Sequence, residues 1–378
     1  MRKPELRSVT VDLPALPLTG GASAKISLNS WQEYYAIAER IESQFARSFS
    51  IGHFDYQHPK GLQKNRPMRF RKPLVVKVSY TDWGDATAPV LICCGGVANS
   101  ARRFSYLASD LKDRFRVVCM DWVGRGQSGW MESEHDYTHE TYVEQLRQLI
   151  EHLGSEQVML LGSSLGGSVA IDFCARYPER VSRLILNDIG PYIPRLRRVR
   201  RAETLARFYV FREPAELLRR IGASQKNDGP ISDNVRFYVT YHQTRWSEQD
   251  GGRIYRHDMR AMQAYRTHAQ TAVNQWPLWH AVTCPLLLIH GMSSDALSSA
   301  TIARMQRTRS FALIHVPDTG HTPVLSDRNQ TWYVGAWLLD TESPLAGPIS
   351  VLPTAPRTAR DRGPEAFSVA AHRPDTPP

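Results

Sequence analysis

Cysteine is scarce in this chain, and long apolar runs are missing from it. The 378 residues include five cysteines, none of them spaced as a C-x-x-C pair. This excludes a disulfide-stabilised scaffold and gives no sign of a zinc site. No apolar run approaches the roughly 18 residues of a membrane-spanning helix, and Asp12, Pro14 and Pro17 interrupt the segment where a secretory signal would lie. We therefore expect a cytoplasmic protein with no transmembrane segment.

Acidic residues are absent from one long stretch. Residues 56–81 carry seven Lys or Arg and no Asp or Glu, and residues 195–220 carry nine Arg against three Glu. The formal charge of +10 therefore resides in two local patches. We expect them to be mainly solvated surface, with attraction of an anionic substrate or surface as the alternative. Neither patch belongs to a nucleic-acid-binding motif, so no nucleic-acid partner is expected.

The composition is otherwise that of a globular protein, with 42% hydrophobic and 22% charged residues, which makes wholesale disorder improbable. We divide the chain into an N-terminal extension (1–73), a core in two pieces (74–190 and 279–340), an inserted helical cap (191–278) and a tail (341–378). The tail has eight prolines and almost no apolar periodicity, so we expect it to be disordered. Within the extension, residues 30–47 have apolar residues at helical spacing behind a Ser30–Glu33 capping box. This helix either covers the core or forms a contact between copies of the chain.

Short apolar runs alternate with helical patterns through the core, which predicts a mostly parallel sheet with helices on both faces. The expected strands are 74–80, 90–94, 115–120, 158–161, 184–186, 286–289 and 312–316, and the expected helices are 103–111, 138–153, 165–177 and 298–307. Several strands are apolar at consecutive positions, as strands buried on both faces should be.

The strongest chemical signal is Gly162-Ser163-Ser164-Leu165-Gly166. A bare G-x-S-x-G pattern is weak evidence, but here a buried strand precedes it and a helix follows it. A sharp turn from strand to helix needs glycine at positions 162 and 166, and it would lift the Ser164 hydroxyl out of the sheet. The sequence therefore predicts Ser164 as a catalytic nucleophile.

A serine nucleophile needs a base, and the base needs a carboxylate to orient it. Of the 13 histidines, His321 follows the final predicted strand in a glycine-containing loop, at the sheet edge where open α/β sheets place their sites. His290 and His315 lie within strands and are more typical of core histidines. For the acid, Asp295 occupies the loop after the preceding strand and is favoured, with Asp188, just after strand 184–186, as the rival.

The chain order Ser164, Asp295, His321 with a cap inserted after the serine resembles the α/β-hydrolase superfamily. Two further segments resemble family motifs, Asp121–Ser128 (D-x-x-G-x-G-x-S) and Leu186–Pro191 at the exit into the cap. The resemblance implies an oxyanion hole made by the backbone N–H groups of Gly96 and Leu165. The family commonly has His-Gly before the first of these donors, and here Cys94 stands in place of the histidine. We interpret Cys94 as a packing residue.

These residues predict a serine hydrolase that cleaves a carboxylic ester through an acyl-enzyme, with no metal or organic cofactor. The expected substrate is a small, largely apolar ester held partly by cap aromatics, and a homo-oligomer is kept among the expected partners. Two alternatives stay open. One is carbon–carbon bond hydrolysis of a diketo-acid, whose carboxylate the cap arginines would bind. The other is a catalytically silent binding module.

Overall fold

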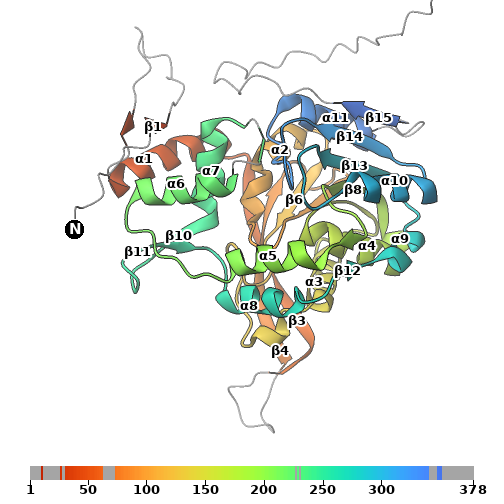
Figure 1. Cartoon of the computed structure of the whole chain (residues 1–378), viewed down its shortest axis with the longest axis horizontal. Helices are drawn as coiled ribbons and strands as arrows, with labels where there is room; N and C mark the ends of the chain where they lie inside the picture. The colour runs from red at the N-terminus through yellow and green to blue at the C-terminus, as the bar shows by residue number, and fades with distance from the viewer. Residues whose placement is uncertain are drawn as a thin grey trace, which may run out of the picture.

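The computed structural model describes residues 10–11, 26–27, 30–62, 73–225, 228–229, 231–339 and 347–350. A nine-stranded sheet forms its centre, in the order β15-β14-β13-β8-β7-β5-β6-β4-β3 (Figure 1). The strands are β3 (Phe49–Leu62), β4 (Pro73–Trp83), β5 (Val90–Cys94), β6 (Arg116–Met120), β7 (Val158–Ser163), β8 (Val181–Asn187), β13 (Leu286–Gly291), β14 (Ala312–Val316) and β15 (Gly347–Ser350).

From β6 to β15 the neighbouring strands are parallel, while β4 runs antiparallel to β6 and to β3. The central strands β5, β7 and β13 are buried over nearly their whole length, which explains why they are apolar at consecutive positions. Parallel strands end at one edge, so the loops that follow β7, β8, β13 and β14 are brought together there.

Helices cover both faces of the sheet. One face carries α3 (His139–His152), α4 (Leu165–Arg176) and α10 (Ser299–Thr308), and the other carries α2 (Ser105–Leu111) and α11 (Arg328–Leu339). Successive side chains of one strand point to opposite faces of the sheet: Ile92 packs on the side of α3 and α4, whereas Leu91 and Cys93 pack on the side of α2 and α11. The predicted mostly parallel, doubly covered sheet is confirmed.

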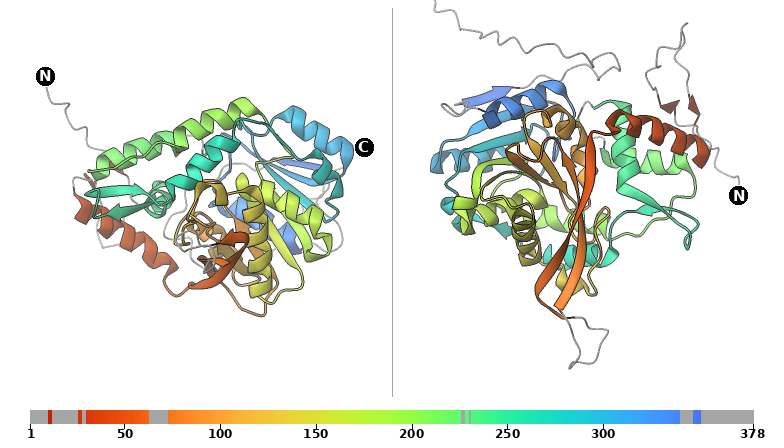
Figure 2. Two further views of the ribbon diagram at one scale, coloured as in Figure 1. Left: turned by 90° about the horizontal axis from the view of Figure 1, so that it is seen from below. Right: turned by 180° about the vertical axis from the view of Figure 1, so that it is seen from behind.

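Two parts of the sheet were not anticipated. β3 pairs with β4 in a long two-stranded ribbon that Figure 2 shows from behind, and its residues alternate between exposed and buried positions. β15 pairs in parallel with β14, so residues 347–350 are a strand although the tail was expected to be disordered. The rest of the 341–378 tail lies outside the described residues. Residues 63–72 of the first basic stretch also lie outside them.

Between β8 and β13 the chain forms an insertion made mainly of helices. Its elements are β9 (Tyr192–Ile193), α5 (Arg195–Leu205), α6 (Pro214–Gln225), α7 (Asp233–Gln243), the hairpin β10 (Thr244–Ser247) and β11 (Gly252–Tyr255), α8 (Met259–His268), β12 (Val273–Asn274) and α9 (Trp276–Ala281). Helix α5 crosses in front of the sheet, and α6, α7 and the hairpin lie to one side of it (Figure 1).

The predicted N-terminal helix is α1 (Trp31–Glu42), and its capping box forms: Ser30 Oγ accepts from Glu33 N, and the Glu33 carboxylate accepts from Ser30 N. Its apolar face packs on the insertion, with the Tyr34 and Phe237 ring centroids 4.7 Å apart. The Trp31 indole N–H also donates to the Arg212 carbonyl at 3.0 Å. The buried face of α1 belongs to the same apolar cluster as α2 and α11, which agrees with the expected covering role; a contact between copies of the chain stays a prediction. Two shorter strands, β1 (Thr10–Val11) and β2 (Ile26–Ser27), pair with each other.

In the part of the chain that the structure describes, none of the helices has the length and apolar character required to cross a lipid bilayer.

Candidate active site

Ser164 lies at the turn between β7 and α4, in a backbone conformation that is rare for serine. Its φ is +53° and its ψ is −112°, so the residue is strained relative to ordinary β or helical geometry. Ser164 is only partly buried, whereas Ser163 before it is fully buried in the sheet. The strand, the strained residue and the helix together form the sharp turn that the sequence predicted around Ser164.

Two glycines permit this turn. A Cβ on Gly162 would lie 2.5 Å from the Gly166 carbonyl oxygen, and a Cβ on Gly166 would lie 2.2 Å from the Cys94 carbonyl oxygen. Both distances are far below van der Waals contact. The turn can therefore pack against β5 only when both positions lack a side chain.

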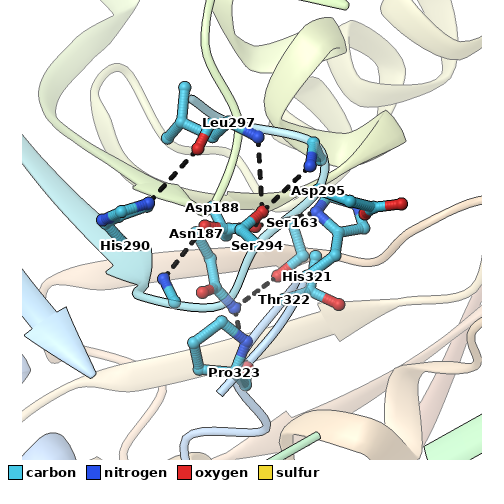
Figure 3. Close-up of polar contacts among 12 residues, drawn as sticks. Ser163, Asn187, Asp188, His290, Ser294, Asp295, Leu297, His321, Thr322 and Pro323 are labelled. Carbon is cyan, nitrogen blue, oxygen red and sulfur yellow. Dashed lines mark hydrogen bonds and ion pairs between the residues drawn. The ribbon is translucent and has the colours of Figure 1, made fainter. Parts of the chain in front are cut away.

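Asp188 occupies the equivalent position on the neighbouring strand. Ser163 and Asn187 are partners in the β7–β8 register, so Ser164 and Asp188 leave the sheet at the same level of adjacent strands. The Asp188 side chain is fully buried, and it too has a positive φ, +54°. Its Oδ1 accepts from the Gly291 N–H at 3.0 Å, and its Oδ2 accepts from the Ser294 hydroxyl at 2.5 Å (Figure 3).

His321 lies in the loop after β14, and its Nδ1 is 2.9 Å from Asp188 Oδ2 (Figure 3). Ionised Asp188 can only accept, so this contact places the proton on Nδ1 and leaves the lone pair on Nε2. Among the described residues Nε2 is buried without a hydrogen-bond partner, so a bond from Ser164 is not made in this state. Burial lowers the pKa of His321; the bond to Asp188 opposes this, and the charges of Arg197 and Arg201 lower the pKa further.

The preference for Asp295 over Asp188 as the partner of His321 is corrected by this geometry. Asp295 points away from the buried carboxylate site; its side chain is 62% exposed, and its Oδ1 lies 3.3 Å from Arg197 Nε. The chain turns sharply after β13, with Ser294 N donating to the Gly291 carbonyl, and this turn directs Ser294 inward to Asp188. Asp295 is the next residue after Ser294, and it lies beyond the part of the loop that faces Asp188.

The two expected oxyanion donors differ in whether their N–H group already has a hydrogen-bond acceptor. Leu165 is the first residue of α4, so its N–H has no acceptor within the helix. Gly96 lies beside the serine, since a Cβ there would be 3.3 Å from Ser164 Cβ. However, the Gly96 N–H donates to Asn99 Oδ1 at 3.1 Å, so an oxyanion would have to displace or share this bond. A charged oxygen is a stronger acceptor than a neutral amide, which makes such an exchange favourable.

A cavity of about 410 Å³ opens beside Ser164, between the sheet and the insertion. This volume is within the range of small-molecule sites. Apolar wall residues are Val97, Leu165, Ile193, Ala261, Val273 and Leu278. Of the described insertion aromatics, Tyr265 lines it; Tyr209, Phe211 and Tyr255 pack on one another, and Trp279 packs on Phe311.

Much of the cavity wall is polar, whereas the favoured expectation from the sequence was a site for a largely apolar ester and arginines in the cap were an alternative. Three guanidinium groups contribute to it, from Arg125, Arg197 and Arg198, together with one carboxylate, Asp172. Burial raises the pKa of Asp172, but the bonds from His139 and Arg176 outweigh this effect and hold the pKa below its usual range. Asp172 is thus an anion that already has its own counter-charge, with Arg176 Nε 2.6 Å from Oδ1.

Buried polar side chains fasten these loops to one another. Asn187 Nδ2 donates to Ser163 Oγ and to the Pro323 carbonyl, both at 2.9 Å, so it joins the serine turn to the histidine loop (Figure 3). Arg125 is 1% exposed and donates from Nε to the Val97 carbonyl at 2.8 Å, next to the expected oxyanion loop. The motifs Asp121–Ser128 and Leu186–Pro191 include Arg125 and Asn187 without indicating what either side chain does, and no motif marked Ser294.

Comparison with known proteins identifies the class. Residues 89–327 match the alpha/beta hydrolase fold family, and the chain belongs to this family. A 3-hydroxybutyrate-oligomer hydrolase of Cupriavidus necator is 30% identical over 263 residues, which are 67% of this chain and 90% of the relative. A 2-(acetamidomethylene)succinate hydrolase of Mesorhizobium japonicum is 26% identical over 62% of this chain and 82% of its own length.

Among solved structures, a putative hydrolase from Rickettsia typhi superimposes with a TM-score of 0.68 at 23% sequence identity. The match covers 76% of this chain and 98% of that chain. The likeness therefore extends over nearly the whole neighbour and supports the fold. The chain is accordingly a hydrolase of the alpha/beta fold family.

Proposed function

We propose that the protein is a serine hydrolase that cleaves carboxylic esters, with Ser164 as nucleophile, His321 as base and Asp188 as the acid that orients the base. The observation that carries this proposal is the bond between His321 and buried Asp188, because Asp188 leaves the strand next to β7 at the level of Ser164. Arg197 connects the two halves of the site, because it lines the cavity with Ser164 and its charge acts on His321.

In this mechanism Ser164 Oγ attacks the ester carbonyl carbon while His321 Nε2 takes the hydroxyl proton. The oxyanion accepts from the N–H groups of Leu165 and Gly96, the latter after exchange with Asn99. His321 then gives its proton to the leaving alkoxide, and the alcohol departs. In the second half of the reaction His321 Nε2 takes a proton from water, and the water oxygen attacks the acyl carbon. His321 then returns the proton to Ser164 Oγ, which releases the carboxylic acid and restores Ser164.

The relatives favour an ester as the class of substrate, but they do not identify a particular compound. The units of a 3-hydroxybutyrate oligomer are joined through ester bonds, so the name of the Cupriavidus relative fits this chemistry. We propose that the insertion acts as a cap, because α5 and α8 both contribute residues to the cavity wall. Carbon–carbon bond hydrolysis is the second candidate, since arginines in the wall would also suit a keto-acid.

A fluorophosphonate probe followed by a panel of para-nitrophenyl esters tests the proposal. The wild type should be labelled and should turn over at least one ester, and Ser164→Ala should lose both properties because the probe reacts only with an activated serine. Ser299→Ala, at an exposed serine of α10, is the control and should behave as the wild type. Labelling that survives Ser164→Ala would contradict the nucleophile. Labelling without ester turnover would favour the carbon–carbon reaction, and the absence of both would favour a binding module.

A further inference from the structure

Arg198 is a buried cation in the wall of the cavity that Ser164 also lines. It lies on α5 and is 9% exposed. Its described contacts are the Thr271 carbonyl, which accepts from Nη1 at 2.6 Å, and the Tyr265 side chain, which hydrogen-bonds to Arg198 and has its ring centroid 5.8 Å from Cζ. Neither carries a negative charge. A guanidinium has several N–H donors, so this environment leaves both charge and hydrogen-bonding capacity unsatisfied.

The other charges in the wall do not neutralise Arg198. Asp172 is bound by Arg176 and His139, and Arg197 already faces the exposed Asp295. Arg125 donates to the carbonyls of Val97 and Val123 and to the Tyr142 hydroxyl, so it is held by neutral acceptors within the fold. The cavity beside Ser164 therefore has an excess of positive charge.

Leaving a cation buried without a counter-charge costs free energy, and burial lowers the pKa of Arg198 accordingly. An anionic ligand group would recover that cost, and a planar guanidinium matches a carboxylate through two parallel hydrogen bonds. Among the described residues of the wall, Arg198 has donors left over and no carboxylate partner, so it favours a negative charge on the ligand. This differs from the largely apolar ester that the sequence led us to expect.

Resting on the proposed function, we propose that the ester substrate carries a free carboxylate and that Arg198 binds it. The carboxylate lies in the half of the ester that occupies the cavity, and the scissile carbonyl lies at Ser164. Arg198 is then the residue that determines specificity for an acidic ester over its neutral counterpart.

Two matched pairs of esters test this inference. In the first pair the acyl half carries the charge: para-nitrophenyl hydrogen adipate is compared with the same ester in which the carboxylate is a primary carboxamide. In the second pair the alcohol half carries it: an acetoxyalkanoate is compared with its carboxamide. In one of the pairs the wild type should prefer the carboxylate by about 10- to 100-fold in kcat/KM, the range for a charge-assisted hydrogen bond.

Three variants separate binding from folding. Arg198→Gln should abolish the preference by slowing the carboxylate ester alone, and Arg198→Lys should retain part of it because the charge is kept. Arg200→Gln, on an exposed residue of the same helix, should leave the preference unchanged. If Arg198→Gln fails to fold, as judged by circular dichroism, Arg198→Lys decides: a retained preference supports the proposal, and a lost one overturns it.

No preference in either pair, or a preference that survives Arg198→Gln, overturns the inference. If both esters of a pair are still cleaved in a Ser164-dependent way, the proposed function stands and only the carboxylate site falls. If none of the four esters is turned over, the ester hydrolase itself is contradicted, and the carboxylate site falls with it.

Discussion

Asp188 receives three hydrogen bonds while it is fully buried, from Gly291, Ser294 and His321. A buried carboxylate with that many donors is held in one orientation, and it fixes in turn the tautomer of His321. Ser294 has a second function, because its Oγ also accepts from the N–H groups of Ala296 and Leu297. The sharp turn after β13 and the orientation of the His321 ring are therefore parts of one network.

Replacing Asp188 and Asp295 separately should distinguish the two candidates for the acid. Asp188→Asn keeps the size of the side chain but favours the wrong tautomer of His321, so kcat on an active ester should fall by about ten-thousandfold. Asp295→Asn should change kcat little, because Asp295 is exposed and contacts only Arg197. Equal losses in the two variants would remove the distinction, and a greater loss in Asp295→Asn would reverse it.

The pH profile should report the pKa of His321. The base must be neutral to accept the serine proton, so kcat/KM falls as pH drops below that pKa. Burial lowers this pKa, so activity should persist below the pH at which an exposed histidine would be half protonated. The positive charge of Arg197 lowers it too, so Arg197→Gln should raise the pKa and move the acid limb to higher pH. A limb that stays in place or moves to lower pH would contradict this assignment.

At this scale the sequence predicted the position of Ser164 and His321 but not the choice of acid. The serine is marked by glycines that the turn requires, and the histidine by a loop after the last central strand. Asp188 and Asp295 follow neighbouring strands, and the difference between them is the path of the turn after β13. That turn depends on contacts of Ser293 and Ser294 with residues far along the chain, which apolar periodicity does not reveal.

Helix α1 is the element whose role could least be read from its own residues. Its amphipathic pattern and its capping box were evident, and the structure forms both. Its partners lie in the insertion: Tyr34 packs on Phe237, and the Tyr35 hydroxyl is 3.2 Å from Arg253 Nη1. Strand β3 was also not predicted from the sequence. This strand lies at the edge of the sheet, and its alternating pattern is bordered by charged residues.

Removing the Tyr34 side chain should weaken the attachment of α1 to the insertion. Tyr34 is fully buried, and Tyr34→Ala would leave a cavity beside Phe237 and remove the ring that faces Arg253. We expect a loss of about 3 kcal/mol in the free energy of unfolding, measured by urea denaturation. Trp332→Ala removes a larger but partly exposed aromatic from α11 and should cost less. Equal losses would argue that α1 contributes no more than a surface contact.

At the scale of the whole molecule, the fold shows where part of the formal charge of +10 lies. The first part of the second basic patch forms α5, which places Arg197 and Arg198 in the cavity wall and leaves Arg195 and Arg200 exposed. The first patch lies in part outside the described residues, so its role stays a prediction. The cytoplasmic location expected from the sequence likewise stays a prediction.

Salt should therefore affect acidic and neutral esters differently. The positive potential around α5 attracts an anion over distances of about one Debye length, which shortens from about 30 Å at 0.01 M to about 8 Å at 0.15 M ionic strength. We expect kcat/KM for a carboxylate-bearing ester to fall as sodium chloride is added over this range. The matched carboxamide ester should respond little. The same salt dependence for both esters would indicate a general effect on the protein.

The attachment of α1 to the insertion also has a consequence for synthesis of the chain. Glu42 at the end of α1 contacts His242, which is 200 residues later. At about 5 to 20 residues per second, a ribosome needs about 10 to 40 s to produce that partner after α1 has emerged. During this time the apolar side chains of Tyr34, Ile37 and Ile41 have no insertion to cover them. The nascent chain thus exposes an apolar segment well before the loop that contains His321 is synthesised.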